Sequence, residues 1–304
     1  MITGFEYEGL YYKDKYFSVC VGINPNIKEA KLHKETRVIA NKAFFLNSNL
    51  KKIICNEKLQ RIGGFAFSAS KIEDIVLPSS INKIEEHAFD NCHKLKKVNL
   101  ENVNVSILEE GTFLRCKKLE NIIFPKNLKK IRKDCFAGCE KLGNIDIPNT
   151  VERIEAGAFK HTALTQFVVP PLVKVIYEEA FSECNLNEID LSNIKEICHL
   201  AFSNNPNLRN IKLPNSLKSL NISAFNKTGI YEIALPSNIE RISIGKNSNI
   251  QEIRYETLPE NIESEIKKEC DEYGISFLKI DLDYLIEQGK SFHEINKFFK
   301  EQER

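Results

Sequence analysis

Four of the nine cysteines stand at one position of a repeated pattern, three residues after a phenylalanine. Thiolates stacked in register could hold a metal ion or form a redox-active ladder. The sequence contains no Cys-x-x-Cys spacing, however, and free cysteine packs well as a small apolar residue. We therefore expect buried, reduced thiols in a turn, with no metal and no cofactor. The four residues are Cys92, Cys116, Cys139 and Cys184.

The other residues that could do chemistry do not form a catalytic set. The histidines show no His-Glu-x-x-His spacing and share no repeat position, which predicts scattered surface residues. Gly289-Lys290-Ser291 imitates the end of a phosphate-binding loop, but Tyr284 stands where the first glycine would be. With no positioned nucleophile, base or metal set, we expect no enzyme. The histidines are His33, His87, His93, His161, His199 and His293.

The overall charge and hydropathy of the chain exclude several classes of partner. A formal net charge of +1 over 304 residues gives no global field for nucleic acid, so none is expected as a partner. No apolar run reaches the roughly 18 residues of a membrane helix, and the N-terminus does not resemble an export signal. We expect a cytoplasmic protein. The alternative is a cell-surface or secreted protein whose signal peptide has been removed.

The elements that carry these residues repeat every 21 to 24 positions. The repeats share a phenylalanine anchor and an upstream Leu/Ile pair. A short strand follows downstream, in several repeats as a Leu-x-x-Ile-x-Leu-Pro run such as 119–125. Residues two apart on a strand point to the same side, so Ile122 and Phe124 face the core while Asn121 and Ile123 face outward. We expect such strands also at 142–148 and 208–214. The anchors are Phe44, Phe67, Phe89, Phe113, Phe136, Phe159, Phe181, Phe202 and Phe225.

This repeat resembles that of the BspA-like, or Treponema pallidum type, leucine-rich-repeat proteins. The motif that carries the resemblance is Leu-x-x-Ile-x-Leu-Pro-x-x-(Leu/Val)-x-x-Ile-x-x-x-Ala-Phe-x-x-Cys, and Gly9-Leu-Tyr-Tyr resembles the opening that often precedes it. The resemblance implies an α/β-type repeat solenoid, a right-handed coil with a parallel β-sheet on the concave face. It also implies a non-enzymatic protein, often a bacterial surface or secreted binding protein and in some relatives an adhesin, with intracellular members also known.

Three segments follow from the pattern. Residues 1–25 are expected to form a capping β-hairpin that turns at Lys13-Asp14-Lys15. Residues 26–255 contain about ten repeats. Residues 256–304 form a C-terminal segment that caps the coil or binds a partner. It contains a predicted helix from Pro259 to Gly274 and a strand over 275–280. Two further short helices are expected within 281–304, which could also form a homodimer.

The outward side chains of the strands are the candidate binding site. Several are β-branched and apolar where a solvated surface would be polar, and solenoids bind partners across such a face. The alternative is that single β-branched residues are exposed simply as good strand formers. The candidate residues are Lys52, Ile54, Asp74, Val76, Lys97, Asn99, Asn121, Ile123, Asn144, Asp146, Gln166, Val168, Glu188 and Asp190.

A second candidate is a local basic patch between residues 117 and 133, which contains a single acidic residue, Glu120, and could meet an acidic partner. We expect the chain to be a protein-binding scaffold of unknown partner, without membrane insertion. The alternatives are a surface adhesin that binds host or matrix proteins and a regulatory subunit of an enzyme. The patch residues are Lys117, Lys118, Lys126, Lys129, Lys130, Arg132 and Lys133.

Overall fold

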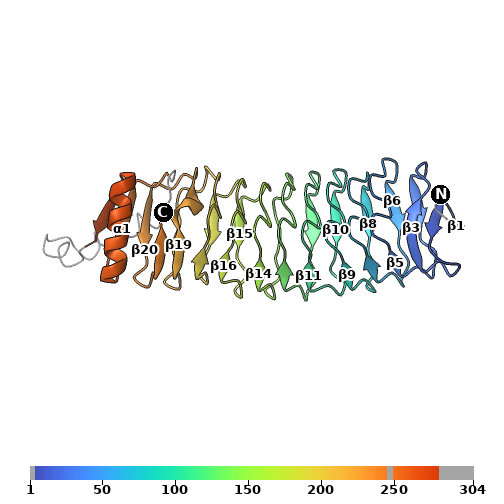
Figure 1. Ribbon diagram of the computed structural model, residues 1–304, viewed down its shortest axis with the longest axis horizontal. Coiled ribbons are helices and arrows are strands. Elements are labelled where there is room, and N and C mark those ends of the chain that lie inside the picture. The colour runs from blue at the N-terminus through green and yellow to red at the C-terminus, as the bar shows by residue number, and fades with distance from the viewer. Residues whose placement is uncertain (1–3, 245–248, 281–304) are drawn as a thin grey trace. The chain divides into compact units, whose positions relative to one another are not determined.

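The computed structural model describes residues 4–244 and 249–280 of the chain. The chain forms two compact units, Met1–Leu164 and Thr165–Arg304. Within each unit, successive coils place their short strands side by side, as Figure 1 shows. The predicted repeat solenoid with parallel strands is therefore confirmed. The expected division at residues 25 and 255 stays a prediction.

One side of the first unit is a five-stranded parallel sheet, with one strand from each successive coil. In each strand the central residue is buried and the two flanking residues are exposed. The central residue is isoleucine or valine in four of the strands and Ala30 in the first. Short runs of this kind form strands because they pair with neighbouring coils. The strands are β4 (Glu29–Lys31), β6 (Lys52–Ile54), β8 (Asp74–Val76), β10 (Lys97–Asn99) and β12 (Asn121–Ile123).

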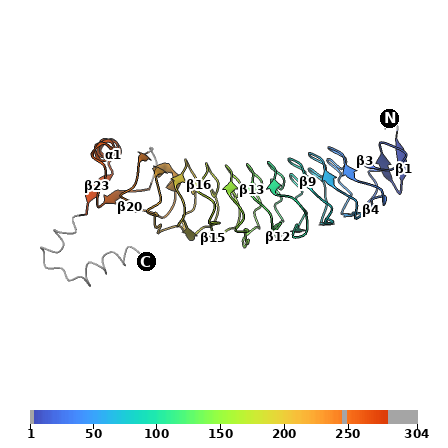
Figure 2. The ribbon, with the colours of Figure 1, turned by 90° about the horizontal axis from the view of Figure 1, so that it is seen from below.

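A second side of each coil contributes a two-residue strand. These strands form separate sheets from those of the first side, and the two sets lie apart in Figures 1 and 2. Their buried residues are the second Leu/Ile of each upstream pair, such as Ile84 and Ile131. The strands are β5 (Val38–Ile39), β7 (Arg61–Ile62), β9 (Lys83–Ile84), β11 (Ile107–Leu108), β13 (Lys130–Ile131) and β14 (Arg153–Ile154).

The third side of each coil is the turn that carries the phenylalanine anchor. Neighbouring anchors stack with ring centroids 5.1 Å apart for Phe67 and Phe89 and 5.4 Å apart for Phe89 and Phe113. The backbone also pairs here, since Phe67 N–H donates to the Ala88 carbonyl at 2.8 Å. Stacking the rings removes them fully from water and adds contact energy between coils. The anchors therefore form the centre of the core.

Eight of the nine anchor turns use left-handed backbone on both sides of the phenylalanine, the exception being that of Phe225. In these eight, the residue two before the anchor has positive φ, as in Phe65, His87 and Gly111, and so does the residue two after it, as in Asn91. Gly111 is required for a second reason, because a Cβ there would lie 2.3 Å from His87 Cε1. Non-glycine residues adopt this conformation at a cost, which the stacked hydrogen bonds of neighbouring coils offset.

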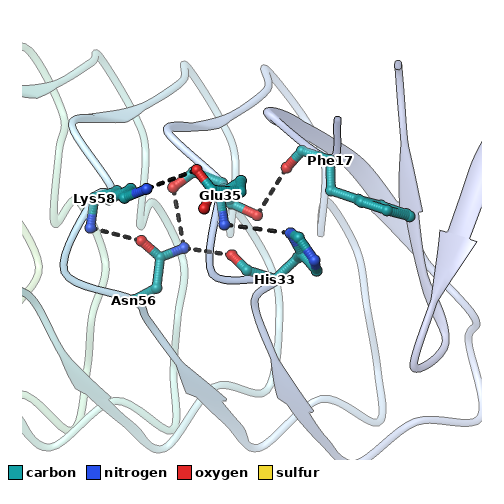
Figure 3. A network of polar contacts seen from close by, with 6 residues as sticks. Phe17, His33, Glu35, Asn56 and Lys58 are labelled. Carbon is teal, nitrogen blue, oxygen red and sulfur yellow. Dashed lines mark hydrogen bonds and ion pairs between the residues drawn. The ribbon is translucent and has the colours of Figure 1, made fainter. Parts of the chain in front are cut away.

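The N-terminal strands close one end of the first unit. Strands β1 (Phe5–Tyr7), β2 (Leu10–Tyr12) and β3 (Val19–Ile23) are antiparallel, and β3 then pairs in parallel with β5. Side-chain bonds continue this junction into the coils. Thr36 Oγ1 donates to the Phe17 carbonyl at 3.0 Å. The amide of Asn56 donates to the Thr36 and His33 carbonyls (Figure 3).

The second unit repeats the plan with shorter sheets. β15 (Gln166–Val168) pairs in parallel with β17 (Glu188–Asp190). A four-stranded sheet has the order β16 (Val175–Ile176), β18 (Glu196–Ile197), β19 (Ser219–Asn221) and β21 (Arg241–Ser243), and Ile222–Phe225 forms a short 3₁₀ helix. A three-stranded sheet has the order β20 (Glu232–Leu235), β22 (Glu252–Tyr255) and β23 (Ser276–Lys279).

Helix α1 (Glu260–Tyr273) covers part of the second unit. It buries Ile262, Ile266 and Cys270 and ends at Gly274, which adopts the left-handed conformation typical of a helix stop. It contacts β21 and β23. The predicted helix from Pro259 to Gly274 and the strand that follows are confirmed. Residues 281–304, where two further helices were expected, lie outside the described residues.

Two predicted strands are wrong. Residues 144–146 of the first unit and 210–212 of the second join no sheet in the described part of the chain. Their central residues, Ile145 and Ile211, are only half-buried. Glycine, asparagine and aspartate disfavour strands, and Gly143-Asn144-Ile145-Asp146 combines all three. At residues 143–146 the apolar spacing was kept, but the backbone preference for a strand was not.

Candidate functional site

The outward residues of the five-stranded sheet form two straight rows. The strand register places Glu29 beside Lys52 and Lys52 beside Asp74, and it pairs Lys97 with Asn121. We call Glu29, Lys52, Asp74, Lys97 and Asn121 the charged row. Because Asn99 pairs with Val76, Lys97 follows Asp74 along this row. The parallel row beside it, which we call the apolar row, contains Lys31, Ile54, Val76, Asn99 and Ile123.

The apolar row is exposed to solvent. Val76 is 73% exposed, Ile123 is 50% exposed and Ile54 is 47% exposed. An open groove runs past Ile54 and Val76 and continues over Leu77 and Pro78, with Lys52 and Asp74 also in its wall. Apolar side chains gathered at a groove with charged walls are typical of a binding surface.

The charged side chains of the charged row form no ion pairs among the described residues. Within the residues that the structure describes, Lys52, Asp74 and Lys97 form no ion pair, and neither does Glu29. The ion pairs of this region use other positions, such as Lys51 with Glu73 at 3.3 Å. Alternating charges directly side by side stabilise the sheet modestly, and their heads stay hydrated. The row can therefore pair with charges brought by a partner.

The remaining candidates of the strand face are not continuous with these rows. Asn144 and Asp146 are exposed but belong to no strand, for the reason given above. In the second unit, Gln166 pairs with Glu188 and Val168 with Asp190 in a sheet of only two strands. Val168 is 77% exposed. The second unit thus presents a smaller face of the same kind.

Two residues of the face were missed by the sequence analysis, Glu29 and Lys31. They extend both rows by one strand, because β4 pairs in register with β6. The repeat pattern did not reveal β4, since Ala30 occupies its buried position instead of isoleucine. The signal that could have found it is the 23-residue spacing back from Lys52 and Ile54.

The basic patch is largely neutralised by neighbouring coils. Glutamates from the adjacent coils pair with Lys117 at 2.8 Å, Lys126 at 3.1 Å and Arg132 at 3.2 Å. Lys129 likewise pairs with Glu152 at 3.4 Å. Among the described residues, Lys118, Lys130 and Lys133 form no ion pair. These three lie before β12, within β13 and after β13, so they do not gather on one sheet.

The column of cysteines packs as predicted. Cys92, Cys116 and Cys139 are fully buried, and each thiol donates to the carbonyl of the anchor phenylalanine one coil earlier, at 3.1 to 3.2 Å. Burial raises the pKa of the Cys116 thiol well above its usual range. All nine cysteines are free. These thiols act as hydrogen-bond donors inside the core.

Cys55 lies half-buried at the groove beside the apolar row. Burial, assisted by the charge of Glu57, raises the pKa of its thiol to about 12. A thiol that stays protonated at neutral pH is a weak nucleophile. In the described residues, no group of three or more His, Cys, Asp or Glu side chains could hold a metal ion. No helix among them is long and apolar enough to cross a membrane.

The histidines are not all surface residues, so that prediction is wrong in part. His161 and His199 are exposed, but His87 is half-buried and its ring stacks on Phe65 at 4.7 Å. His33 packs edge-on against Tyr7 in the N-terminal strands. His87 shares with Phe65 the left-handed position two before the anchor, which holds its ring against the preceding coil. His293 lies outside the described residues.

Comparison with known families settles which repeat this is. The family model described as BspA type leucine rich repeat region matches residues 22–143 and 129–254, with six copies. The chain belongs to the BspA-type leucine-rich-repeat family. The resemblance seen in the repeat motif is thereby confirmed. No curated protein matches the chain.

Solved structures of bacterial leucine-rich-repeat proteins share the fold. A leucine-rich repeat protein from Bacteroides ovatus is 21% identical, with 84% of each chain covered and a TM-score of 0.54. A leucine rich cell surface protein from Faecalibacterium prausnitzii is 17% identical, with 94% of each chain covered and a TM-score of 0.54. The pneumococcal vaccine antigen PcpA is 17% identical over 84% of this chain and 80% of its own, with a TM-score of 0.52.

Proposed function

We infer that this chain is a non-catalytic binding protein and that the five-stranded sheet of the first unit contacts another protein. The observation that carries this inference is the apolar row, in which Ile54, Val76 and Ile123 are exposed next to charges without ion-pair partners. Singly exposed apolar residues need no explanation, but a row along one sheet lies where repeat proteins bind partners.

A capture experiment tests this function. Wild-type chain, Val76→Asp and a matched control, Leu172→Asp, are immobilised and exposed to the soluble and membrane fractions of the source cells. Leu172 is 50% exposed in the second unit, so both substitutions place a charge at an exposed apolar site. We expect Val76→Asp to lose the captured protein and Leu172→Asp to keep it, because a charge facing an apolar partner is desolvated without compensation.

Capture that survives both Val76→Asp and Ile123→Asp would contradict a role for this sheet. The exposed Val168 of the second unit provides a separate test. If Val168→Asp alone abolishes capture, binding belongs to the two-stranded sheet of β15 and β17. The unfolding transition of each variant serves as the control for folding.

A second candidate is a surface adhesin that binds host or matrix proteins. It is favoured by the Faecalibacterium prausnitzii structure, which is described as a cell surface protein. Fractionation of the source cells, with antibody labelling of intact cells, distinguishes this setting from a cytoplasmic one. Labelling of intact cells supports the adhesin, whereas recovery only after lysis supports a cytoplasmic scaffold.

A further inference from the structure

The charged row has a symmetry that a binding surface for an unrelated protein does not need. Along the sheet its charges alternate, with Glu29 negative, Lys52 positive, Asp74 negative and Lys97 positive. A row of four alternating charges becomes its own complement when its order is reversed. The middle of the row lies between β6 and β8.

A two-fold axis parallel to the strands, placed over this midpoint, performs that reversal. It turns a second copy of the sheet face to face with the first, keeps the strand direction and reverses the strand order. Lys52 of each copy then faces Asp74 of the other, and Glu29 faces Lys97. Such an interface uses the same surface twice, which is the commonest symmetry of protein dimers.

The apolar row fits the same axis. Ile54 and Val76 lie on the two strands that flank the midpoint, so each faces the other across the axis. Both side chains are exposed in the single chain and would leave water on contact. Further out, Lys31 faces Asn99, so no like charges oppose each other in this row. Apolar residues at the centre with charges around them are the usual arrangement of an interface.

We propose that the five-stranded sheet of the first unit binds a second copy of this chain, face to face, about the two-fold axis between β6 and β8. This proposal rests on the proposed function and names the partner of that surface. The unpaired state of Glu29, Lys52, Asp74 and Lys97 in the single chain supports it, because each charge gains a partner in the pair.

The size of the face indicates a weak and reversible dimer. About this axis four strands of each copy face each other, β4, β6, β8 and β10. Four strands about 4.8 Å apart span roughly 14 Å, and three residues per strand span about 10 Å. Even with the flanking turns, this is less than the roughly 800 Å² per partner of a standard stable interface. Association should therefore be sought by sedimentation at protein concentrations up to several hundred micromolar and at low salt.

Charge exchange tests the pairing directly. K52E alone places a carboxylate against Asp74 of the second copy, and D74K alone places an amine against Lys52. Each variant should weaken self-association roughly tenfold or more, since like charges across an interface repel. When the two variants are mixed, every facing pair again has opposite signs. The mixture and the double variant K52E/D74K should both associate about as well as the wild type.

The matched control is K133E, which makes the same charge change at an exposed residue outside the sheet and should leave association unchanged. Circular dichroism checks that each variant is folded. If a single charge variant loses its β-sheet spectrum, a cross-linking experiment takes its place. Chains carrying I54C are mixed with chains carrying V76C, and mild oxidation should join them by a disulfide, because these two positions face each other across the axis. A monomeric wild type, equal association of all variants, or failure of the mixed chains to join overturns the proposal.

Val76→Asp, tested for both capture and self-association, separates this proposal from the proposed function. If a different protein is captured and lost with Val76→Asp while the wild type stays monomeric at every concentration, the binding function stands and self-association fails. If neither self-association nor capture depends on Val76, both fail.

Discussion

At the scale of single residues, one repeat position donates hydrogen bonds to buried backbone carbonyls with different chemical groups. Three residues after the anchor, the thiol of Cys116 donates to the carbonyl of the preceding anchor at 3.1 Å. In the second unit, the amide of Asn205 donates to the Phe181 and Phe202 carbonyls, both at 2.8 Å. A buried carbonyl without a donor costs free energy, so this position requires a small donor rather than cysteine itself.

The left-handed position two before the anchor gives the first prediction. Gly111→Ala should lower the free energy of unfolding by about 1–3 kcal/mol, because φ is +57° and the new Cβ would lie 2.3 Å from His87 Cε1. Urea unfolding measures the change. Gly64→Ala is the control, since a Cβ there meets only ordinary contacts, the nearest at 3.5 Å. Adding His87→Ala to Gly111→Ala should recover part of the lost stability. If Gly111→Ala, Gly64→Ala and the double variant were equally stable, neither the strain nor the clash at position 111 would be real.

The buried thiols predict how stability depends on pH. Burial raises the pKa of Cys20 to about 12 and that of Cys270 to about 11, whereas an unfolded cysteine has a pKa of about 8.5. Above about pH 8.5 the unfolded chain loses thiol protons that the folded chain keeps. Stability from these thiols is therefore fully present below about pH 8.5 and is lost as pH rises toward 11 to 12.

Urea unfolding with a reductant, repeated between pH 7 and 11, measures this effect. The free energy of unfolding should be level to about pH 8.5 and then fall. Cys270→Ala should reduce the slope by up to about 1.4 kcal/mol per pH unit, the contribution of one group. A slope that is the same in the variant would mean that other groups cause the loss.

At the scale of elements, each strand depends on its neighbours as much as on its own residues. Strands of three residues, such as β10 and β12, are too short to be stable alone and exist because the register joins them. The segment 144–146 shows the limit of this support. It lies one repeat after β12, yet Asn144 and Asp146, together with the preceding Gly143, leave it outside the sheet.

Hydrogen exchange should show this difference between neighbouring segments. The amides of residues 144–146 should exchange faster than those of 121–123, because only the latter belong to a sheet. Replacing Asn144 by Thr and Asp146 by Val should slow exchange in the segment and raise stability by up to about 1 kcal/mol. Exchange in 144–146 that is as slow as in β12 would show that the ladder continues through it.

At the scale of the whole molecule, charge is organised between coils rather than along the sequence. Seven basic residues between 117 and 133 look like a patch when read along the chain. The coil brings Glu101, Glu109, Glu140 and Glu152 beside four of them. These pairs are exposed and contribute little stability, but they cancel the local field.

This cancellation predicts that the basic patch is not the binding site. Neutralising its unpaired members with K118Q/K130Q/K133Q should change partner capture less than about twofold, whereas Val76→Asp should reduce it roughly tenfold or more. Quantitative pull-down of the captured protein at low and high salt measures both. A large loss with the triple variant, together with strong salt dependence, would assign binding to the patch instead.

The sequence alone determined the coil, the anchors and the buried cysteines. These features depend on apolar residues at a fixed period, and a period is visible in one dimension. It also determined helix α1, because Pro259 and Gly274 mark its ends.

The tertiary structure decided what the surface presents. It showed that Glu29 and Lys31 extend the face, that Asn144 and Asp146 leave it, and that the charged row alternates without internal ion pairs. The reason is that exposed side chains interact with residues one coil away, about 23 positions along the chain, where no local pattern constrains them. Burial favours an apolar residue at the same position of every repeat, so such a position can be recognised within one repeat. The pattern of charged and apolar groups on the surface forms only when the coils are stacked.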